Sequence, residues 1–432
     1  MSNLSSTNSR PAIQEVLQLK NPRTRAFVLF LLAFAMRLTY IVVLHTYRHI
    51  DSAELISVAR CLAHFHMFGN PFPTPTGPTA IVAPGYPFLL SLIYSAFGVS
   101  SVGEVVQEIS CTLVTSFSIA MIVFFAEAGD YAVGAGVLAA SLGALLPTKL
   151  WIETKGAWST PYDALILVLL CIFTLRHWKR PRFTPRTAIL HGILWGLAML
   201  FAPAFLPILL AFLLVGLFLV TRQQRATYLG WACLLLAASL VMLVPWTVRN
   251  FEQLGGVVFV RDNLGLELYI ANNDRSLPTL EENMKLPMRP HPNDNHLEAE
   301  ELIRQGELKY NQQKLRSSIR WIEDHPNRFA LLTVQRFLYF WFPSTNQLWK
   351  RVLTGLITLL GWLGFVISYR THRLASIMIA VLWIVYPLIY YVMQADPRYP
   401  YPIYWTLLLL AAVAIFDLGA RSRELVIGGA SS

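Results

Sequence analysis

The stretch 26–69 reads "AFVLFLLAFAMRLTYIVVLHTYRHIDSAELISVARCLAHFHMFG" and joins an apolar run directly to a polar one. The apolar part, 26–44, has about the length that a helix needs to cross a bilayer. A single charged residue, Arg37, interrupts it. Two carboxylates, Asp51 and Glu54, follow within a few residues of its end. The stretch therefore predicts a membrane helix that places acids at the membrane surface.

The composition of the whole chain is that of a membrane protein. Of its 432 residues, 55% are hydrophobic and only 14% are charged, against roughly 25% charged in soluble domains. The net charge of +10 does not indicate nucleic-acid binding, because the basic residues cluster in short loops between apolar runs. The four cysteines are scattered, without the spacing of a metal site or a disulfide framework. We therefore expect an all-α polytopic membrane protein.

Apolar runs of membrane-helix type occur about ten times. They are 26–44, 104–126, 131–149, 161–178, 188–205, 206–221, 227–245, 349–368, 374–394 and 401–418. If the N-terminus is cytoplasmic, every strongly basic short loop falls on the same side, as the positive-inside rule requires. These basic segments are 176–186, 221–225, 368–373 and 421–424. We expect cytoplasmic termini, and the short soluble parts favour a bacterial inner membrane over an endoplasmic-reticulum membrane.

Two shorter runs do not fit this count as spans. The run 86–98 is too short to cross and predicts a re-entrant or interfacial helix. The run 329–343 is aromatic-rich, carries Arg336, and predicts an interfacial segment. Segment 246–348 has most of the chain's polar sequence, and we expect it to form a small extracytoplasmic cap of α/β or mixed structure.

These patterns divide the chain into five parts. The expected parts are a cytoplasmic tail (1–25), a transmembrane catalytic module that includes the outer loop 45–103 (26–245), the extracytoplasmic cap (246–348), C-terminal transmembrane helices (349–418) and a second cytoplasmic tail (419–432).

The two acids allow a structural and a chemical interpretation. "DSAE" at 51–54 is a capping box, with Asp51 at the N-cap and Glu54 three residues on. The same position, at the start of a helix beside the membrane, also suits a carboxylate that does chemistry. The stretch 70–87 follows, with six prolines and two glycines. It predicts a rigid, non-helical wrap that lines a cavity or packs on protein.

Five motifs in this order resemble a known superfamily. They are "DSAE" (51–54), "TGPTAIVAPGYPFLLSLIYSAFG" (76–98), "VPWTVRN" (244–250), "NLGLELYIANN" (263–273) and "ADPRYPYPIY" (395–404). The chain resembles, over nearly its whole length, the membrane glycosyltransferases of GT-C fold that use polyprenyl-phosphate sugars. The protein O-mannosyltransferases and the lipid A aminoarabinose transferases are the most similar in motif order.

The resemblance implies that an acid in the first outer loop is the catalytic base or a metal ligand. Asp51 takes that position here, with Glu54 to orient it or to cap the helix. Family members often have a second acid before a proline at the outer end of the fourth helix. This chain has Thr160 there, before Pro161. Asp163 and Glu153 are the substitutes, although Asp163 could simply cap its helix.

A lipid-phosphate donor also needs positive charge, and the planar fork of arginine suits phosphate. The candidates are Arg398, Arg249, Arg261 and Arg37. Arg398 could instead pair with Asp396, Arg249 could be an interface anchor, and Arg37 could pair with an acid. Tyr86 and Pro84 would belong to a substrate loop. The histidines at 45, 49, 64 and 66 match no standard metal site, so a divalent cation is expected, if at all, on Asp51.

The resulting hypothesis is a glycosyltransferase that moves a hexosyl or pentosyl group on the extracytoplasmic face. Asp51 would deprotonate an acceptor hydroxyl on a protein, lipid or glycan, and one-step displacement would invert the anomeric carbon. The alternatives are a transporter or flippase of lipid-linked sugars and a non-catalytic assembly subunit. The sequence lacks the two-fold repeat that many transporters show.

Overall fold

The structure is a computed structural model that describes residues 19, 21–48, 54–343, 345 and 347–429, with side chains up to 419. Asp51 and His49 therefore lie outside the described residues. The described chain is almost entirely helical. Its β-structure is limited, within these ranges, to two isolated bridges, between Gly69 and Pro78 and between Thr279 and Ala395. The expected all-α class is confirmed.

Seven helical segments of the described chain are long and apolar enough to cross a membrane. They are α2 (Pro22–Leu44), α5 (Ser101–Ala128), α8 (Thr160–Lys179), η2 with α11 (Arg222–Leu254), α17 (Leu348–Thr371), α18 (Arg373–Val385) with α19 (Leu388–Val392), and the first part of α20 (Tyr401–Gly429). These helices define an integral membrane protein. The bounds also show that α11 runs past the expected module boundary at 245, through Pro245, which lies inside the helix.

The other three expected spans lie on shorter helices, so a count of ten is not confirmed. The runs 131–149, 188–205 and 206–221 correspond to α6 (Val133–Leu145), α9 (Pro185–Met199) and α10 (Phe205–Leu219). Prolines explain two of the early ends, because the residue before a proline avoids the α conformation. Pro147 follows the end of α6, and Pro203 follows the end of α9.

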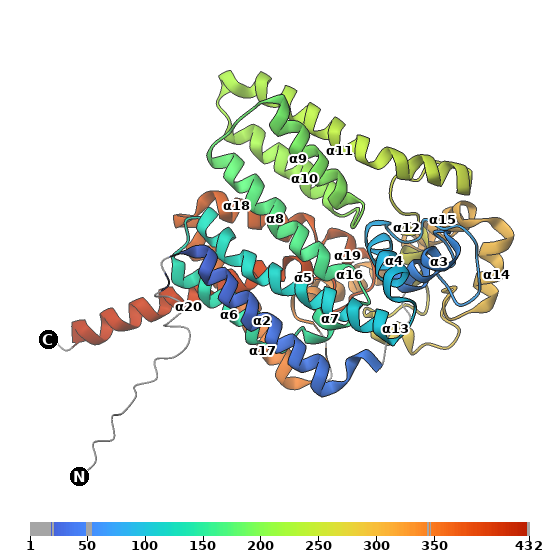
Figure 1. The fold of residues 1–432 in the computed structure, drawn as a ribbon, viewed down its shortest axis with the longest axis horizontal. Helices are drawn as coiled ribbons and strands as arrows, with labels where there is room; N and C mark the ends of the chain where they lie inside the picture. The colour runs from blue at the N-terminus through green and yellow to red at the C-terminus, as the bar shows by residue number, and fades with distance from the viewer. Residues whose placement is uncertain (1–18, 20, 49–53, 344, 346, 430–432) are drawn as a thin grey trace, which may run out of the picture.

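The remaining helices are mostly at one end of the molecule. They are η1 (Thr46–Arg48), α3 (Glu54–Phe65), α4 (Gly85–Phe97), α7 (Leu150–Lys155), α12 (Leu264–Ala271), α13 (Leu280–Met284), α14 (His296–Gln305), α15 (Glu307–Asp324) and α16 (Pro326–Trp341). Figure 1 shows α3, α4 and α12 to α15 gathered opposite the end where α2 begins. The described part of 246–348 contains helices and no strand, so the expected α/β or mixed cap is not confirmed.

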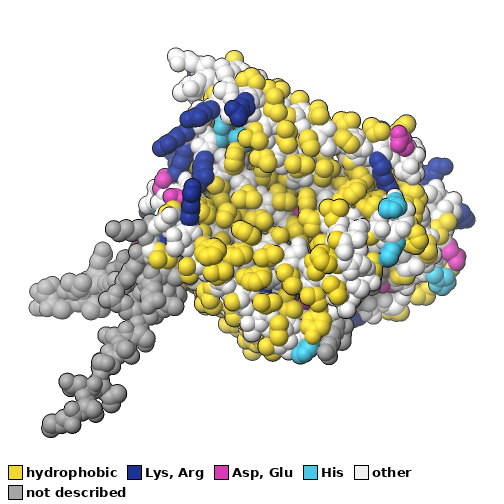
Figure 2. All heavy atoms as spheres, viewed as in Figure 1, with side chains coloured by type: hydrophobic (Ala, Val, Ile, Leu, Met, Phe, Trp, Pro, Cys, Tyr) yellow, Lys and Arg dark blue, Asp and Glu magenta, His cyan; other side chains and the backbone are white. Residues whose placement is uncertain are grey.

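The surface separates into regions of different character. Figure 2 shows a broad hydrophobic surface across the middle of one face, with Lys and Arg toward its left and right ends. Exposed arginines in the loops 176–186, 221–225 and 368–373 follow or precede the helix ends on the side away from α3 and α12 (Figure 1). The basic loops therefore share one end, as the sequence predicts.

Close helix packing holds the bundle together. Helix α5 packs against α2, α6 and α8, and α20 packs against α6, α8 and α17. At Gly361 and Gly364 of α17, a side chain would collide with Leu407 and Leu410 of α20. Small residues at such contacts let membrane helices approach backbone to backbone, where lipid gives no hydrophobic drive to association.

The proline-rich wrap is fastened to the helical end by two charged residues. Arg249 of α11 donates to the carbonyl oxygens of Phe68 and Thr79 at 2.5 and 2.7 Å. Glu307 of α15 accepts from the Thr79 hydroxyl and, at 2.7 Å, from the Ala80 N–H. The wrap packs on protein, as expected.

Candidate active site

Arg398 lies in the short connection between α19 and α20. Its backbone N–H donates to Asp396 Oδ1 at 2.8 Å, and its Nε lies 3.5 Å from the same oxygen. The guanidinium carbon is 5.0 Å from the ring centre of Trp158 and 5.3 Å from that of Tyr399. The aromatic rings fix the plane of the guanidinium, while the contact to Asp396 is long. Arg398 is thus positioned by its neighbours, which include an ion-pair partner, Asp396.

Glu54 is the first residue of α3 and pairs with a histidine from a distant segment. His291 Nδ1 accepts from the Asn293 N–H at 3.0 Å, so its proton lies on Nε2, which is 3.2 Å from Glu54 Oε1. Burial alone would raise the pKa of Glu54, but the His291 contact and the charges of Arg261 and Arg398 outweigh it and lower the pKa. Glu54 is a carboxylate within electrostatic reach of both arginines.

Asp163 brings a second acid to the same place. It lies in the first turn of α8, is 5% exposed, and accepts from Ser159 Oγ at 2.9 Å. Its other oxygen, Oδ1, is buried without a hydrogen-bond partner among the described residues. The charge of Arg261 acts on it. Arg261 itself is exposed and donates through Nε to Ile81 O at 3.0 Å.

Glu54, Asp163, Arg261 and Arg398 form a group that we call the acid–arginine cluster. They come from four separate segments, namely the start of α3, the start of α8, the loop before α12 and the loop before α20. The structure therefore brings together four of the residues that the sequence singled out. Asp163 supplies a buried acceptor oxygen within electrostatic reach of Arg261, and both arginines act on Glu54. This combination is suited to a ligand that carries both hydroxyl groups and an anionic group.

The Glu54 pair predicts a pH effect on stability. Because the folded pKa of Glu54 is lowered, its contribution is present above the ordinary carboxyl value of 4.5 and is lost as pH falls below that value. As pH falls from 6 to below 4.5, we expect the native protein to lose more stability than Glu54→Gln does. Detergent unfolding curves at several pH values measure this difference, and superimposable curves would refute it.

Glu153 and Arg37 lie together in a separate, buried ion pair. Arg37 Nη2 is 2.7 Å from Glu153 Oε2. The same guanidinium donates to Gly143 O and Ala144 O at 2.8 and 3.2 Å, at the end of α6. The last carbonyl groups of a helix lack partners within it, and a cation there also suits the helix dipole. Of the two expectations for Arg37, the structure therefore shows pairing with an acid.

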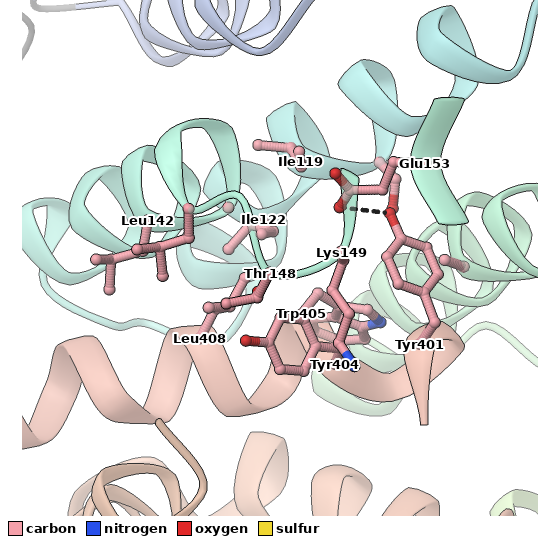
Figure 3. Close-up of a pocket in the computed structure, with 14 residues that line it drawn as sticks. Ile119, Ile122, Leu142, Thr148, Lys149, Glu153, Tyr401, Tyr404, Trp405 and Leu408 are labelled. Atoms are coloured by element: carbon pink, nitrogen blue, oxygen red, sulfur yellow. Dashed lines mark hydrogen bonds between the residues drawn. The ribbon is translucent and has the colours of Figure 1, made fainter. Parts of the chain in front are cut away.

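A pocket adjoins this ion pair, and Figure 3 shows its lining. Glu153 accepts from the Tyr401 hydroxyl at 3.0 Å at one side of the pocket. Lys149, only 5% exposed, donates to Pro397 O at 3.2 Å and lies 5.3 Å from the Tyr404 ring centre. Apolar walls come from α5, α6 and α20, with Ile119, Ile122, Leu142, Leu146, Trp405 and Leu408. The pocket is polar where it meets the 394–400 loop and apolar elsewhere.

Other predicted residues have structural contacts. Arg249 fastens the wrap, as described above. Arg336 is buried and donates to Asn272 Oδ1 and Val392 O, both at 3.0 Å. Tyr86 donates to Gly156 O and packs on Tyr162, and the buried Pro84 precedes α4. His45, His64 and His66 are exposed. Among the described residues, no group of three or more His, Cys, Asp or Glu could hold a metal ion.

Sequence reasoning missed three residues of this region. Lys149 ends an apolar run that predicts a membrane span. A lysine two residues after the proline that ends a helix is unusual in such a run, and this is the signal that points to it. Trp158 has the character of an interfacial aromatic residue. His291 lies in a polar loop with no local signal, and its contact with Glu54 spans most of the chain.

Comparison with known proteins identifies solved structures that share the fold of this chain. No protein-family model matches the chain, and no curated protein matches it significantly in sequence. Solved structures that match include the oligosaccharyltransferase AglB from Archaeoglobus fulgidus in complex with an inhibitory peptide and a dolichol-phosphate, at a TM-score of 0.55 and 15% identity. The match covers 93% of this chain and 51% of the archaeal one.

Two further structures of the Archaeoglobus fulgidus oligosaccharyltransferase agree. One, a complex with Zn and sulfate, has a TM-score of 0.53 at 15% identity and the same coverage. The other, tethered to an acceptor peptide containing the NVT sequon, has a TM-score of 0.54 at 14% identity and covers 92% of this chain and 50% of that one. This chain thus spans about half the length of these proteins and shares their helical membrane fold. The fold that the motif resemblance implied is confirmed.

Proposed function

We propose that the protein is a membrane glycosyltransferase that moves a sugar from a polyprenyl-phosphate donor to an acceptor hydroxyl. The acid–arginine cluster carries this proposal, because two of its members are next in sequence to residues at a mostly apolar pocket. Asp163 precedes Ala164, which lines the pocket, and Arg398 follows Pro397, whose carbonyl oxygen accepts from the lining residue Lys149. The shared fold supports it, since a solved archaeal oligosaccharyltransferase contains a dolichol-phosphate and another an acceptor peptide. A lipid-linked donor and a protein, lipid or glycan acceptor are the partners that follow.

The parts of the donor match the parts of the site. The apolar walls in Figure 3 would hold the first units of the lipid. The phosphate would meet Arg398, with Lys149 on the other side of the 394–400 loop. The sugar would lie toward Asp163, whose unpartnered Oδ1 is a ready acceptor for a sugar hydroxyl. Arg261 and Glu54 would line the acceptor side.

Asp51 is the proposed base. It precedes Glu54 by three residues, so its chain position is next to the acid–arginine cluster, although its side chain is outside the described residues. Deprotonation of the acceptor hydroxyl by Asp51 would accompany attack on the anomeric carbon, and the leaving phosphate would be stabilised by Arg398. A single displacement inverts the configuration. A divalent cation on Asp51 remains a prediction, and one of the solved archaeal structures is a complex with Zn.

We further propose the membrane orientation and domain division expected from the sequence. The basic loops would face the cytoplasm of a bacterium, which puts the acid–arginine cluster and the segment 246–348 on the outer face of the inner membrane. A division near 254 suits the chain better than one at 245, because α11 continues to Leu254.

Product formation without a gradient tests this function against the alternatives. Purified protein in detergent would be incubated with labelled polyprenyl-phosphate sugars and a mixture of hydroxyl acceptors. A transferase forms a covalent product, whose anomeric configuration by NMR should be inverted. A flippase would form none in detergent but would move labelled donor across proteoliposomes, and an assembly subunit would do neither.

Arg398 should be needed for turnover. Replacing it with Gln should lower kcat/KM by about 100-fold, because the leaving phosphate loses a charged, planar donor. Lys should restore only part, since it lacks the bidentate fork. Initial rates over a range of donor concentrations measure this, with the exposed Arg320 changed to Gln as the matched control. If both Gln variants have equal rates, Arg398 does not belong to the active site.

A further inference from the structure

A second pocket lies where α8, α9, α10 and α11 meet, at the basic end of the molecule. Two histidines and a threonine contribute to its lining, from the last turns of α8 and the first half of α9. The rest is largely aromatic, with Trp178, Trp195, Phe212, Tyr228 and Trp231. None of these residues belongs to the acid–arginine cluster or to the pocket in Figure 3, so the proposed transfer reaction does not account for them.

The two histidines and the threonine of this pocket have polar side-chain atoms without a hydrogen-bond partner among the described residues. His191 is 6% exposed, and its Nδ1–H donates to Thr187 O at 2.8 Å, which leaves Nε2 as an acceptor. That Nε2 is buried without a partner, as are His177 Nε2 and Thr174 Oγ1. The two imidazole centres are 5.1 Å apart. Buried polar atoms without partners cost about 1–3 kcal/mol each, so a group that donates protons fits between them.

The residues around the two histidines indicate the chemical class of the group that donates these protons. His177 stacks on Trp231 at 4.5 Å and 10°, and the aromatic faces around the pocket attract a cation. Because the lining contains no carboxylate to balance a buried positive charge, a cation that carries its own anion suits the pocket better than a bare dication. Exposed arginines lie within about five positions of a lining residue along the chain, before or after it, at Arg176, Arg180, Arg186 and Arg225. They would hold a phosphate at the mouth.

From this arrangement we propose that the pocket binds the primary ammonium headgroup of a zwitterionic phospholipid, phosphatidylethanolamine in chemical class. The ammonium donates to His191 Nε2 and His177 Nε2 and lies against the aromatic rings. The phosphate, two carbons away, lies among the arginines at the membrane surface. The site is a structural lipid site at the end of the protein opposite the acid–arginine cluster, and it does not depend on the proposed transferase function.

A matched pair of lipids tests this site. Full-length protein, delipidated in detergent, would be titrated with dioleoyl phosphatidylethanolamine and with dioleoyl phosphatidylcholine, which has the same phosphate and chains but no N–H donor. Native mass spectrometry counts the bound lipid. We expect at least about fivefold preference for the ethanolamine lipid, which is the effect of about one hydrogen bond that the choline headgroup cannot donate. In His191→Phe, which keeps the ring and removes the lone pair, the preference should disappear, while His296→Phe on exposed α14 keeps it.

Other outcomes would overturn the proposal. Equal binding of the two lipids, or a preference for dioleoyl phosphatidylglycerol, would mean that the ammonium is not recognised. If the preference survives in His191→Phe, the pocket does not bind the headgroup and contains ordered water only. Stoichiometric zinc or copper in the purified native protein would assign the imidazoles to a metal. If His191→Phe does not fold, Thr174→Val removes a neighbouring unpartnered oxygen and should reduce the preference without loss of packing.

Discussion

Asp51→Asn should abolish sugar transfer, with a loss of about 100- to 10,000-fold in kcat, because a general base contributes this much and asparagine cannot accept the proton. Donor binding should change little, since the phosphate contacts are made by arginine. The expected pattern is therefore a fall in kcat at nearly constant KM for the donor. Initial rates of labelled product, with donor binding measured on the same samples, give both quantities.

The control for this result is Asp324→Asn, a change of the same kind at an exposed position at the end of α15. It should keep the native rate. Full activity in Asp51→Asn with a native unfolding curve would show that the base is another residue. Asp163, buried with one unpartnered oxygen, would be the next candidate.

Arg37→Met should destabilise the protein by about 3–5 kcal/mol, because it leaves Glu153 charged, buried and without its cation. It also removes the donors that satisfy the carbonyl groups of Gly143 and Ala144. The double variant Arg37→Met with Glu153→Gln should recover a large part of the loss, since no buried charge is left. Unfolding by SDS titration in mixed micelles measures these free energies.

The matched control is Arg60→Met, which breaks the more exposed pair with Glu104 and should cost less than about 1 kcal/mol. If Arg37→Met and Arg60→Met cost the same, the Arg37–Glu153 pair is not the structural link described here. If the double variant is no more stable than Arg37→Met, the loss comes from the α6 carbonyl groups alone.

The sequence predicted those parts of the structure that depend on local pattern. Hydropathy located helices at all ten apolar runs, and the loop charges predicted which helix ends lie together. The spans expected at α6 and α9 are longer than these helices, because a proline follows each helix before its apolar run ends. For Arg37, the sequence indicated an acid partner and the donor phosphate as alternative partners, and it did not indicate which acid.

The contacts between distant segments could not be predicted in the same way. The pairing of Glu54 with His291 joins α3 to a loop before α14, and no periodicity in either segment indicates the other. Lys149 lies at the end of an expected span, and only the structure shows that it donates to the carbonyl oxygen of Pro397. His177 lies in a basic segment and His191 in an expected membrane helix. Neither segment indicates the pocket, because four separate helices form it.

The most direct test of the transferase proposal is a time course of sugar released or transferred from one labelled polyprenyl-phosphate sugar at a time, by native protein and Asp51→Asn side by side in detergent. The account predicts product from at least one donor with the native protein and none above background with Asp51→Asn, at equal donor binding. Equal product from both proteins, or none from a native protein that binds donor in the presence of acceptor, would contradict it.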